Sequence, residues 1–459
     1  MTSSHRALQV QETLFDLDAI AKDAIGADRT SSFDDPAFAS NKKSAVHRWV
    51  PWIAGFSREF VRGALKRHLP QKGTVLDPFA GVGTTLVEAI LEGHNTIGFE
   101  INPYAALACR TKLNASHLSL TEIKDTLEKF EKFYTQAVQE EYEPKSVPPP
   151  GFKTRAAFYS PLVLWKVLIV QDFIISLENE SLRDFFRIAF ASTLVSYSNY
   201  SYEPSLGRRA TVGKEDIKDF SVGENITKKL HEMAYDTDWM QKQINGRKIS
   251  AQIFHESFFL SWKKLSADSI DLIITSPPYL NNYHYNRNTR PHLYWLGYAH
   301  EPKDFKLLEE QNFGTYWQTV RERADIDLDF HLDNEEIREC VQELRAKTPE
   351  KGIYGGNGWA NYAASYFNDC YRFSKAAKHA LKRRGTALVV IGNSILQGVM
   401  IPTDRYLGKI AESVGLELVD IHIPRATRVG NSIIQSEVRV VKAQASHQLY
   451  EAVVELRKR

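Results

Sequence analysis

The 459-residue sequence is poor in cysteine and has almost no net charge. Its three cysteines, Cys109, Cys340 and Cys370, have no CxxC spacing and no adjacent histidine pattern, which argues against a disulfide framework and a structural zinc site. The 14 histidines show no ligand spacing, so we predict no metal site. With 58 basic and 56 acidic residues, any affinity for nucleic acid must come from locally clustered charge.

The sequence also lacks long apolar runs. None reaches the roughly 18 apolar residues that a membrane span requires, and the first residues show no basic stretch followed by an apolar one. These absences predict a soluble protein of the cytoplasm with no membrane partner. The length exceeds the size at which a single core usually stops growing, so two or more lobes are expected.

A glycine-containing loop follows the first buried strand. The strand 74–76 leads into the loop 77–85, an apolar helix at 86–91 and a second strand at 96–100 that ends in Glu100. This order is typical of a nucleotide-binding α/β sheet, in which a strand-end carboxylate accepts hydrogen bonds from ribose hydroxyls. The loop lacks the third glycine of the dinucleotide fingerprint and the lysine of a P-loop. It therefore predicts a cofactor with a ribose but no pyrophosphate.

A second loop follows the apolar strand 270–274 and reads Thr275-Ser276-Pro277-Pro278-Tyr279. Two consecutive prolines cannot extend a sheet, because neither has a backbone N–H to donate. The strand therefore ends in a rigid loop that presents a hydroxyl, carbonyls and an aromatic ring. Such groups suit a planar base with an exocyclic amine. Alone, a Pro-Pro pair is more often an ordinary strand-to-turn junction.

Together, the two loops resemble those of the S-adenosylmethionine-dependent DNA amino-methyltransferases. The loop 77–85 is similar to their cofactor loop and the residues 276–279 to their catalytic loop, while 46–57 resembles the segment over the methionine end of the cofactor. Glu100 is similar to their ribose-binding acid, and Glu256 stands where they have an acid near the adenine amine. The resemblance implies that the catalytic residues are Ser276, Pro277, Pro278 and Tyr279. It implies that the cofactor-binding residues are Asp77, Phe79, Ala80, Gly81, Gly83, Thr84, Thr85, Glu100, Ile101 and Glu256.

The implied fold is α/β, a Rossmann-like methyltransferase with a mostly parallel sheet of seven strands, a helical insert and a second insert after the catalytic loop. We expect an N-terminal arm (1–45), three core parts (46–114, 246–300 and 361–459), a helical insert that is a candidate target-recognition region (115–245) and a second insert (301–360). Many relatives with a Ser-Pro-Pro-Tyr loop place it before the glycine loop. The reverse order here leaves open which insert reads the target.

Further expectations concern single segments. The densely apolar helices 161–177 and 182–195 predict that the helical insert has its own small core. The Tyr and Arg clusters at 197–209 and 283–290 either contact DNA or form wet surface. Phe79 could be plain core packing and Glu100 a solvated strand-end charge. A helix at 361–384, a strand at 386–391, a helix at 403–414 and strands at 416–423 and 437–441 are expected to complete the sheet.

The resemblance implies methyl transfer from S-adenosylmethionine to the exocyclic N4 of a flipped cytosine in double-stranded DNA. A C5-cytosine enzyme would need a nucleophilic cysteine in a Pro-Cys context, which none of the three cysteines has. Ser276 favours N4-cytosine over N6-adenine, the first alternative. An RNA amino-methyltransferase and a non-catalytic DNA-binding homologue are the others. A restriction–modification role, with a cognate endonuclease or other defence proteins as partners, is implied by analogy with the family.

Overall fold

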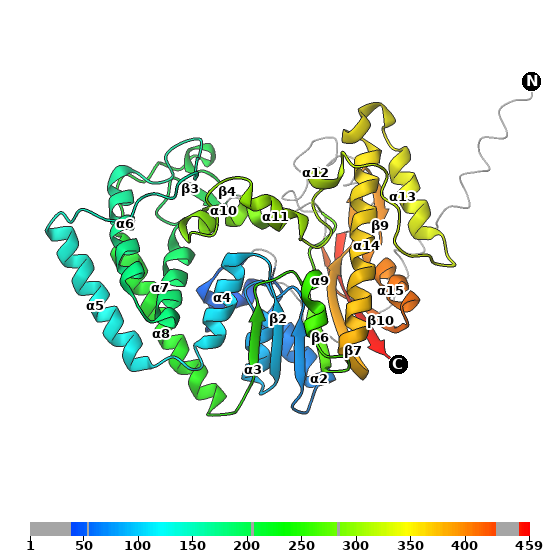
Figure 1. The fold of residues 1–459 in the computed structure, drawn as a ribbon, viewed down its shortest axis with the longest axis horizontal. Helices are drawn as coiled ribbons and strands as arrows, with labels where there is room; N and C mark the ends of the chain where they lie inside the picture. The colour runs from blue at the N-terminus through cyan, green and yellow to red at the C-terminus, as the bar shows by residue number, and fades with distance from the viewer. Residues whose placement is uncertain (1–37, 53–54, 203–205, 282–284, 428–448) are drawn as a thin grey trace, which may run out of the picture. The chain divides into compact units, whose positions relative to one another are not determined.

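The computed structural model describes residues 38–52, 55–202, 206–281, 285–427 and 449–459. Most of the expected N-terminal arm therefore lies outside the described residues. A seven-stranded sheet has the order β10-β11-β7-β6-β1-β2-β5 (Figure 1). Its strands are β1 (Thr74–Asp77), β2 (Asn95–Phe99), β5 (Ala251–Phe254), β6 (Ile270–Thr275), β7 (Leu381–Gly392), β10 (Leu416–Thr427) and β11 (Leu449–Lys458).

All neighbouring strands are parallel except β11, which runs antiparallel to both β10 and β7. The α/β class and the mostly parallel sheet of seven strands are thus confirmed. Parallel strands need crossover connections, and helices that cover both faces of the sheet supply them. Within the ranges that the structure describes, no helix is long and apolar enough to cross a bilayer.

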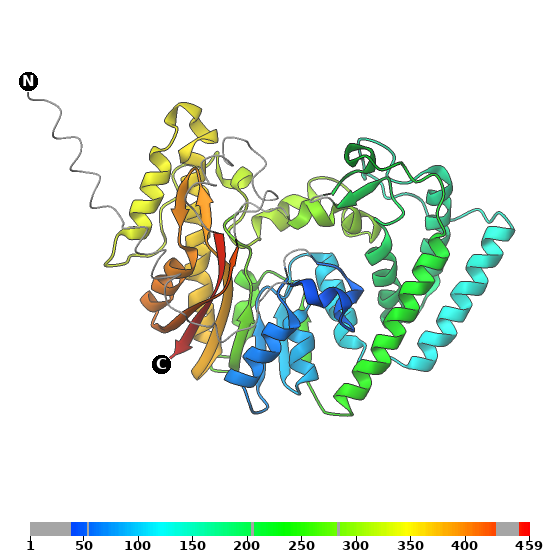
Figure 2. The same ribbon diagram turned by 180° about the vertical axis from the view of Figure 1, so that it is seen from behind.

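Successive residues of β6 pack against different helices. Leu272 and Ile274 share a buried cluster with α2 (Arg58–His68), whose side of the sheet faces the viewer in Figure 2. Ile273 packs with the long helix α14 (Gly356–Ala380) on the opposite face. This alternation follows from the two-residue period of a strand, and it explains why the whole run 270–274 is apolar. Two further helices of the core are α3 (Thr84–Leu91) and α15 (Thr403–Ser413).

The helical insert contains four long helices and a short hairpin. They are α5 (Leu120–Gln139), α6 (Pro161–Ser176), α7 (Glu180–Thr193), α8 (Val222–Ile244), β3 (Tyr200–Tyr202) and β4 (Leu206–Arg208). The prediction of a separate helical core is wrong, because the buried residues of these helices form one continuous cluster with α3 and α4 (Pro103–Asn114). Tyr197 and Tyr200 are buried in this cluster, so neither is the wet surface that the sequence allowed.

Single residues explain the limits of the insert helices. Ser160 precedes α6 as expected, but its hydroxyl does not cap the helix and donates instead to the backbone oxygen of Lys218 at 2.8 Å. The start of α7 is capped by Asn179, whose Oδ1 accepts from the backbone N–H groups of Ser181 and Leu182. α8, which the sequence analysis did not predict, brings the chain back to the sheet.

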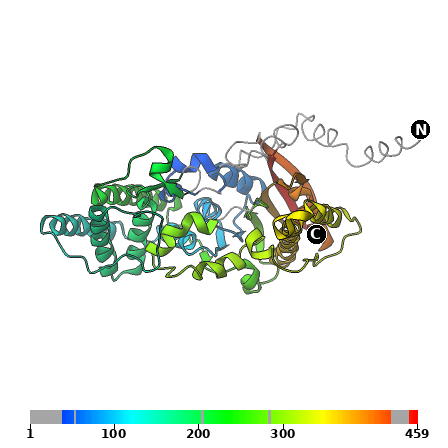
Figure 3. The same ribbon diagram turned by 90° about the horizontal axis from the view of Figure 1, so that it is seen from above.

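The second insert is helical and packs against α14 through its later helices. Its elements and the helix before them are α10 (Tyr285–Trp295), α11 (Asp304–Glu310), α12 (Trp317–Val320), α13 (Glu336–Ala346) and a 3₁₀ helix at Pro349–Tyr354. Seen from above, α10 and α11 lie between the insert helices and α12 (Figure 3).

The last part of the chain differs from the expectation. α14 ends at Ala380 and not near 384, because β7 already begins at Leu381 and bulges over the next residues before regular pairing resumes at Thr386. The predicted strand at 437–441 lies outside the described residues. β11, which the sequence analysis did not predict, fills the place between β10 and β7.

Candidate active site

The glycine loop and the Ser-Pro-Pro-Tyr loop meet at one edge of the sheet. β1 and β6 are parallel neighbours, with Val75 paired to Leu272, so both loops leave from the same end. Asp77, at the end of β1, links them: its Oδ1 accepts from the backbone N–H of Phe79 at 3.1 Å and from the Thr275 hydroxyl at 2.7 Å. Burial raises the pKa of Asp77 to about 6. Asp77 thus holds the two loops together.

Residues from both loops line one pocket, which we call the sheet-edge pocket. The predicted site residues that line it are Phe79, Gly81, Glu100, Ile101, Glu256, Ser276 and Pro278. The predicted residues that do not line it are Asp77, Ala80, Gly83, Thr84, Thr85, Pro277 and Tyr279. Trp52 and Pro78 also line it and lie in the segments 46–57 and 77–85 that resemble those of the family, but neither was predicted as a site residue. The other lining residues that were not predicted are Phe99, Asn102, Ser257, Phe258, Phe259, Asn286, Gln311, Asn312 and Phe313. Asn102 had a local signal, the Asn-Pro start of α4, whereas Asn286, Gln311, Asn312 and Phe313 come from segments with no recognisable motif.

Glu100 lies in the pocket with both carboxylate oxygens engaged by backbone donors. Oε2 accepts from the N–H of Gly81 at 2.8 Å and Oε1 from the N–H of Asn102 at 2.7 Å. Burial raises its pKa to about 7, although these two donors act in the opposite direction. Each oxygen keeps a further lone pair that can accept from a ligand hydroxyl. Glu100 is therefore built into the site and is not a solvated strand-end charge.

The glycine loop adopts backbone conformations that side chains disfavour. Gly81 and Gly83 have φ values of 51° and 85°, and a Cβ on Gly83 would stand 2.7 Å from the Sγ of Cys109. The buried ammonium of Lys112 donates to the backbone oxygen of Val82 at 2.9 Å. The loop is thus held from behind while the backbone of Gly81 stays open to the pocket.

Behind the loop, the remaining predicted residues support its shape. The N–H of Gly83 donates to the oxygen of Ala80 at 2.8 Å, and α3 begins at the next residue, Thr84. The hydroxyl of Thr85 donates to the oxygen of Ile274 in β6 at 3.3 Å. These four residues shape the loop but do not line the pocket.

Phe79 is both core packing and pocket wall. Its ring centroid lies 5.2 Å from that of Phe313 and 6.0 Å from those of Phe258 and Phe259. The same rings line the sheet-edge pocket. Such an apolar, aromatic wall suits a flat heteroaromatic ring.

Within the Ser-Pro-Pro-Tyr loop, Ser276 and Tyr279 face different surroundings. Ser276 lines the sheet-edge pocket, and its hydroxyl bonds to no protein group among the described residues. The Tyr279 ring lies against Gly392 at the end of β7, where a Cβ would stand 3.0 Å from it. Its hydroxyl donates to Glu451 Oε1 at 3.3 Å. Stacking of Tyr279 on a base stays a prediction.

Glu256 lines the pocket but is already bonded to the protein. Its Oε1 lies 2.6 Å from Lys264 Nζ, and its Oε2 accepts from the Ser261 hydroxyl. The bond from Lys264 lowers the pKa of this carboxyl, so it is ionised near neutral pH. Its role beside an adenine amine stays a prediction.

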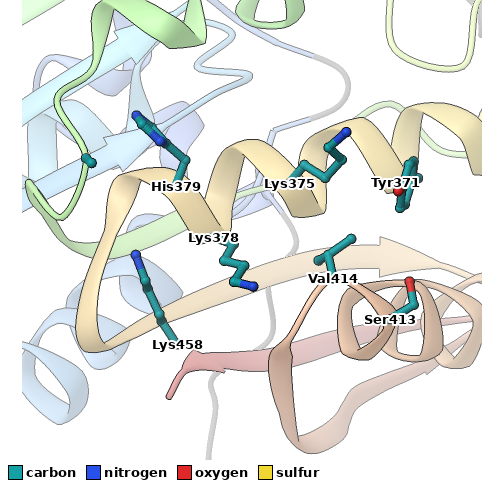
Figure 4. Close-up of a pocket in the computed structure, with 8 residues that line it drawn as sticks. Tyr371, Lys375, Lys378, His379, Ser413, Val414 and Lys458 are labelled. Atoms are coloured by element: carbon teal, nitrogen blue, oxygen red, sulfur yellow. The ribbon is translucent and has the colours of Figure 1, made fainter.

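A second hollow lies at the opposite ends of the strands, where antiparallel β11 ends at Lys458. Lys375, Lys378 and His379 of α14 line it together with Ser413, the last residue of α15 (Figure 4). Cations near helix C-termini offset the partial negative charge there, and Lys458 pairs with Asp268 at 2.6 Å. These roles account for the lysines without a ligand, so we place no site there.

Comparisons with known proteins agree with this geometry. The family model that matches is described as a DNA methylase and covers residues 9–109, which include the glycine loop and Glu100. Type II methyltransferase M.BsoBI from Geobacillus stearothermophilus is 23% identical over 86% of this chain and 83% of its own length. Type II methyltransferase M.MvaI from Kocuria varians is 20% identical over 81% and 82%. Type II methyltransferase M.AvaI from Nostoc sp. (strain PCC 7120) is 23% identical over 86% and 84%.

Among solved structures, the rRNA methyltransferase aviRa from Streptomyces viridochromogenes aligns over 92% of this chain and 94% of that chain. Its identity is 10% and its TM-score 0.32, which is too low to support an argument. The relatives M.BsoBI and M.MvaI match more than four-fifths of the chain. Together with the family model, they confirm the resemblance that the sequence of the two loops indicates. These comparisons support an amino-methyltransferase family for this chain.

Proposed function

We propose that this protein transfers a methyl group from S-adenosylmethionine to the exocyclic N4 of cytosine in double-stranded DNA. One observation carries the proposal: Glu100 and Ser276 line the same pocket, although 176 positions separate them in the sequence. In this proposal a ribose acceptor and an amine acceptor face the same pocket. Such proximity is the main requirement of a direct methyl transfer.

The residues of the sheet-edge pocket fit the cofactor. Glu100 has lone pairs for ribose hydroxyls, and the ring of Phe79 with its aromatic neighbours offers a slot for adenine. Gly81 lines the pocket, so the cofactor would lie against the loop backbone there. When bound, S-adenosylmethionine supplies an electrophilic methyl group on a sulfonium.

The catalytic loop would prepare the target amine. The lone pair of an exocyclic amine is delocalised into the ring, so the amine is a poor nucleophile. The Ser276 hydroxyl and the Pro277 carbonyl would each accept a hydrogen bond from one of its two N–H groups. These two hydrogen bonds would favour a pyramidal nitrogen. Tyr279 would stack on the base after it leaves the duplex. No covalent intermediate with the protein is needed.

The choice of substrate rests on the family and on one loop residue. DNA is favoured because the matching family model is that of a DNA methylase. Ser276 favours N4-cytosine, with N6-adenine as the alternative. We further propose that the insert 115–245 reads the target sequence, since the Tyr202 hydroxyl of its hairpin donates to the Asn288 oxygen of α10 at 2.7 Å and so links the insert to the segment after the catalytic loop. A cognate restriction endonuclease is the proposed partner.

Methylation of a defined nucleoside tests this function. The protein is incubated with labelled S-adenosylmethionine and either duplex DNA or tRNA, and the product is digested to nucleosides and identified by mass. We expect label in DNA as N4-methylcytosine. N6-methyladenine in DNA would overturn the cytosine assignment, and label in tRNA alone would overturn the DNA assignment.

Cofactor affinity is expected to decline between pH 8 and pH 6. Ribose hydroxyls donate best to an ionised carboxylate, and the pKa of Glu100 is raised to about 7. Affinity is therefore fully present above that pKa and should fall about tenfold per pH unit below it. Calorimetric titration with S-adenosylhomocysteine at several pH values measures this. In a Glu100→Gln variant the dependence should vanish. If the pH dependence persists in this variant, it arises from another group, such as Asp77, whose pKa burial raises to about 6.

A further inference from the structure

Asn286 carries a buried hydrogen-bond donor that the protein does not use. This residue lies in the first turn of α10, is only 4% exposed and lines the sheet-edge pocket. Its Nδ2 has no hydrogen-bond partner among the described residues. Buried polar groups are nearly always paired, so the unpaired amide of a residue that lines a pocket calls for a partner beyond the described protein atoms.

Neighbouring residues determine which way the Asn286 amide points. The N–H groups of Tyr104 and Ala105 donate to Asn102 Oδ1 at 3.1 and 3.3 Å, so its Nδ2 faces the other way. This Nδ2 donates to the Thr289 hydroxyl at 2.9 Å and to Asn286 Oδ1 at 3.4 Å. If the Asn286 amide were flipped, its Nδ2 would face the Nδ2 of Asn102, and two hydrogen-bond donors would oppose each other. The N-terminus of α4 thus orients both asparagines, and Asn286 is left with a free donor.

We propose that Asn286 Nδ2 donates a hydrogen bond to the nucleoside half of the cofactor, to a ribose oxygen. The inference rests on the proposed function. Asn286 contacts Asn102, whose backbone N–H binds the carboxylate of Glu100 at 2.7 Å. A ribose hydroxyl can both donate and accept a hydrogen bond. The ionised carboxylate of Glu100 can only accept one. An uncharged amide donor beside it completes the set of groups that a ribose requires.

Binding of two ligands to one variant tests this assignment. Asn286→Leu keeps the side-chain size and removes the donor. We compare S-adenosylhomocysteine with 5′-methylthioadenosine, which keeps the nucleoside but lacks the amino acid half, by calorimetry. The variant should bind both about 5- to 10-fold more weakly, as expected for one lost hydrogen bond. Loss for S-adenosylhomocysteine alone would overturn the ribose assignment, and unchanged affinity for both would overturn any cofactor contact.

Stability without ligand separates this role from a structural one. Asn286→Leu should leave the melting temperature of the free protein unchanged or higher, because it removes an unpaired buried donor, and Asn102 Nδ2, which loses its long bond of 3.4 Å to Asn286 Oδ1, keeps the shorter one of 2.9 Å to the Thr289 hydroxyl. Asn199→Leu is the matched control: Asn199 is 7% exposed, its Nδ2 donates to the Ala157 oxygen at 3.1 Å, and its Oδ1 accepts from the Ile217 N–H at 2.8 Å. That variant should lose stability and keep its ligand affinity. A destabilised Asn286→Leu would contradict the inference. If wild-type protein binds neither ligand, the proposed function itself fails.

Discussion

Ser276→Ala is expected to reduce kcat for methyl transfer by about 100-fold or more, the size of effect seen when one polar group that stabilises a transition state is removed. The Ser276 hydroxyl lines the sheet-edge pocket, where it is free to accept from a substrate amine. The interaction strengthens as the nitrogen becomes pyramidal, so its loss should affect kcat more than the affinity for the cofactor.

Single-turnover methylation and calorimetry with S-adenosylhomocysteine measure the two effects separately. Ser269→Ala is the matched control, because Ser269 directly precedes β6 at its other end and its exposed hydroxyl donates to the Ser266 oxygen at 2.7 Å. That variant should keep wild-type activity. An active Ser276→Ala would exclude the catalytic role. A Ser276→Ala protein that loses cofactor binding but not turnover would place the hydroxyl on the cofactor instead.

Asp236→Ala is expected to lower the free energy of unfolding by about 3–5 kcal/mol, because it leaves the buried Val46 N–H and Trp49 Nε1 without an acceptor, at about 1–3 kcal/mol each, and breaks the ion pair with the partly exposed Arg48. Asp236 of α8 is fully buried and accepts four hydrogen bonds from the segment before α2. The donors are the Val46 N–H at 2.8 Å, Arg48 Nε at 3.0 Å, Arg48 Nη2 at 2.6 Å and Trp49 Nε1 at 3.0 Å.

We also expect Asp236→Ala to weaken cofactor binding, because Trp52 follows the Asp236-bound segment closely in the chain and lines the sheet-edge pocket. Its Nε1 lies 3.4 Å from where a Cβ on Gly81 would stand. Urea denaturation followed by circular dichroism measures stability, and calorimetry measures cofactor affinity. The control is Asp238→Ala on the same helix, whose exposed pair with Lys242 should contribute only a few tenths of a kcal/mol. Equal losses in the two variants would contradict the role of Asp236.

Local sequence predicted the parts of the fold and site that depend on neighbours along the chain. The glycine loop and Glu100 lie on consecutive elements of a strand–helix–strand unit, so their meeting follows from the parallel pairing of β1 and β2. The proline pair ends β6 because neither proline has a backbone N–H to donate to a neighbouring strand. The strands β1, β2 and β6 were recognisable from their short apolar runs.

Long-range packing decided the rest. The insert helices looked able to form their own core, yet they bury their apolar faces against α3 and α4, and no local pattern identifies the partner of an apolar face. The Tyr279 ring packs on Gly392, which is distant in the sequence, and this contact depends on the neighbouring position of β6 and β7. Likewise, Asn286 enters the pocket only because α10 passes the start of α4.

The sequence by itself determined which chemical groups the two loops offer: a hydroxyl and two prolines after a buried strand, a glycine loop and a strand-end acid, with no cysteine in a Pro-Cys context. These features are local, because turn conformation and strand termination depend on a few adjacent residues. Only the tertiary structure decided which residues share the pocket, such as Glu100, Ser276 and Asn286. Glu100 lies more than a hundred positions from both of the others, and strand order and helix packing, which are properties of the whole chain, bring it to them.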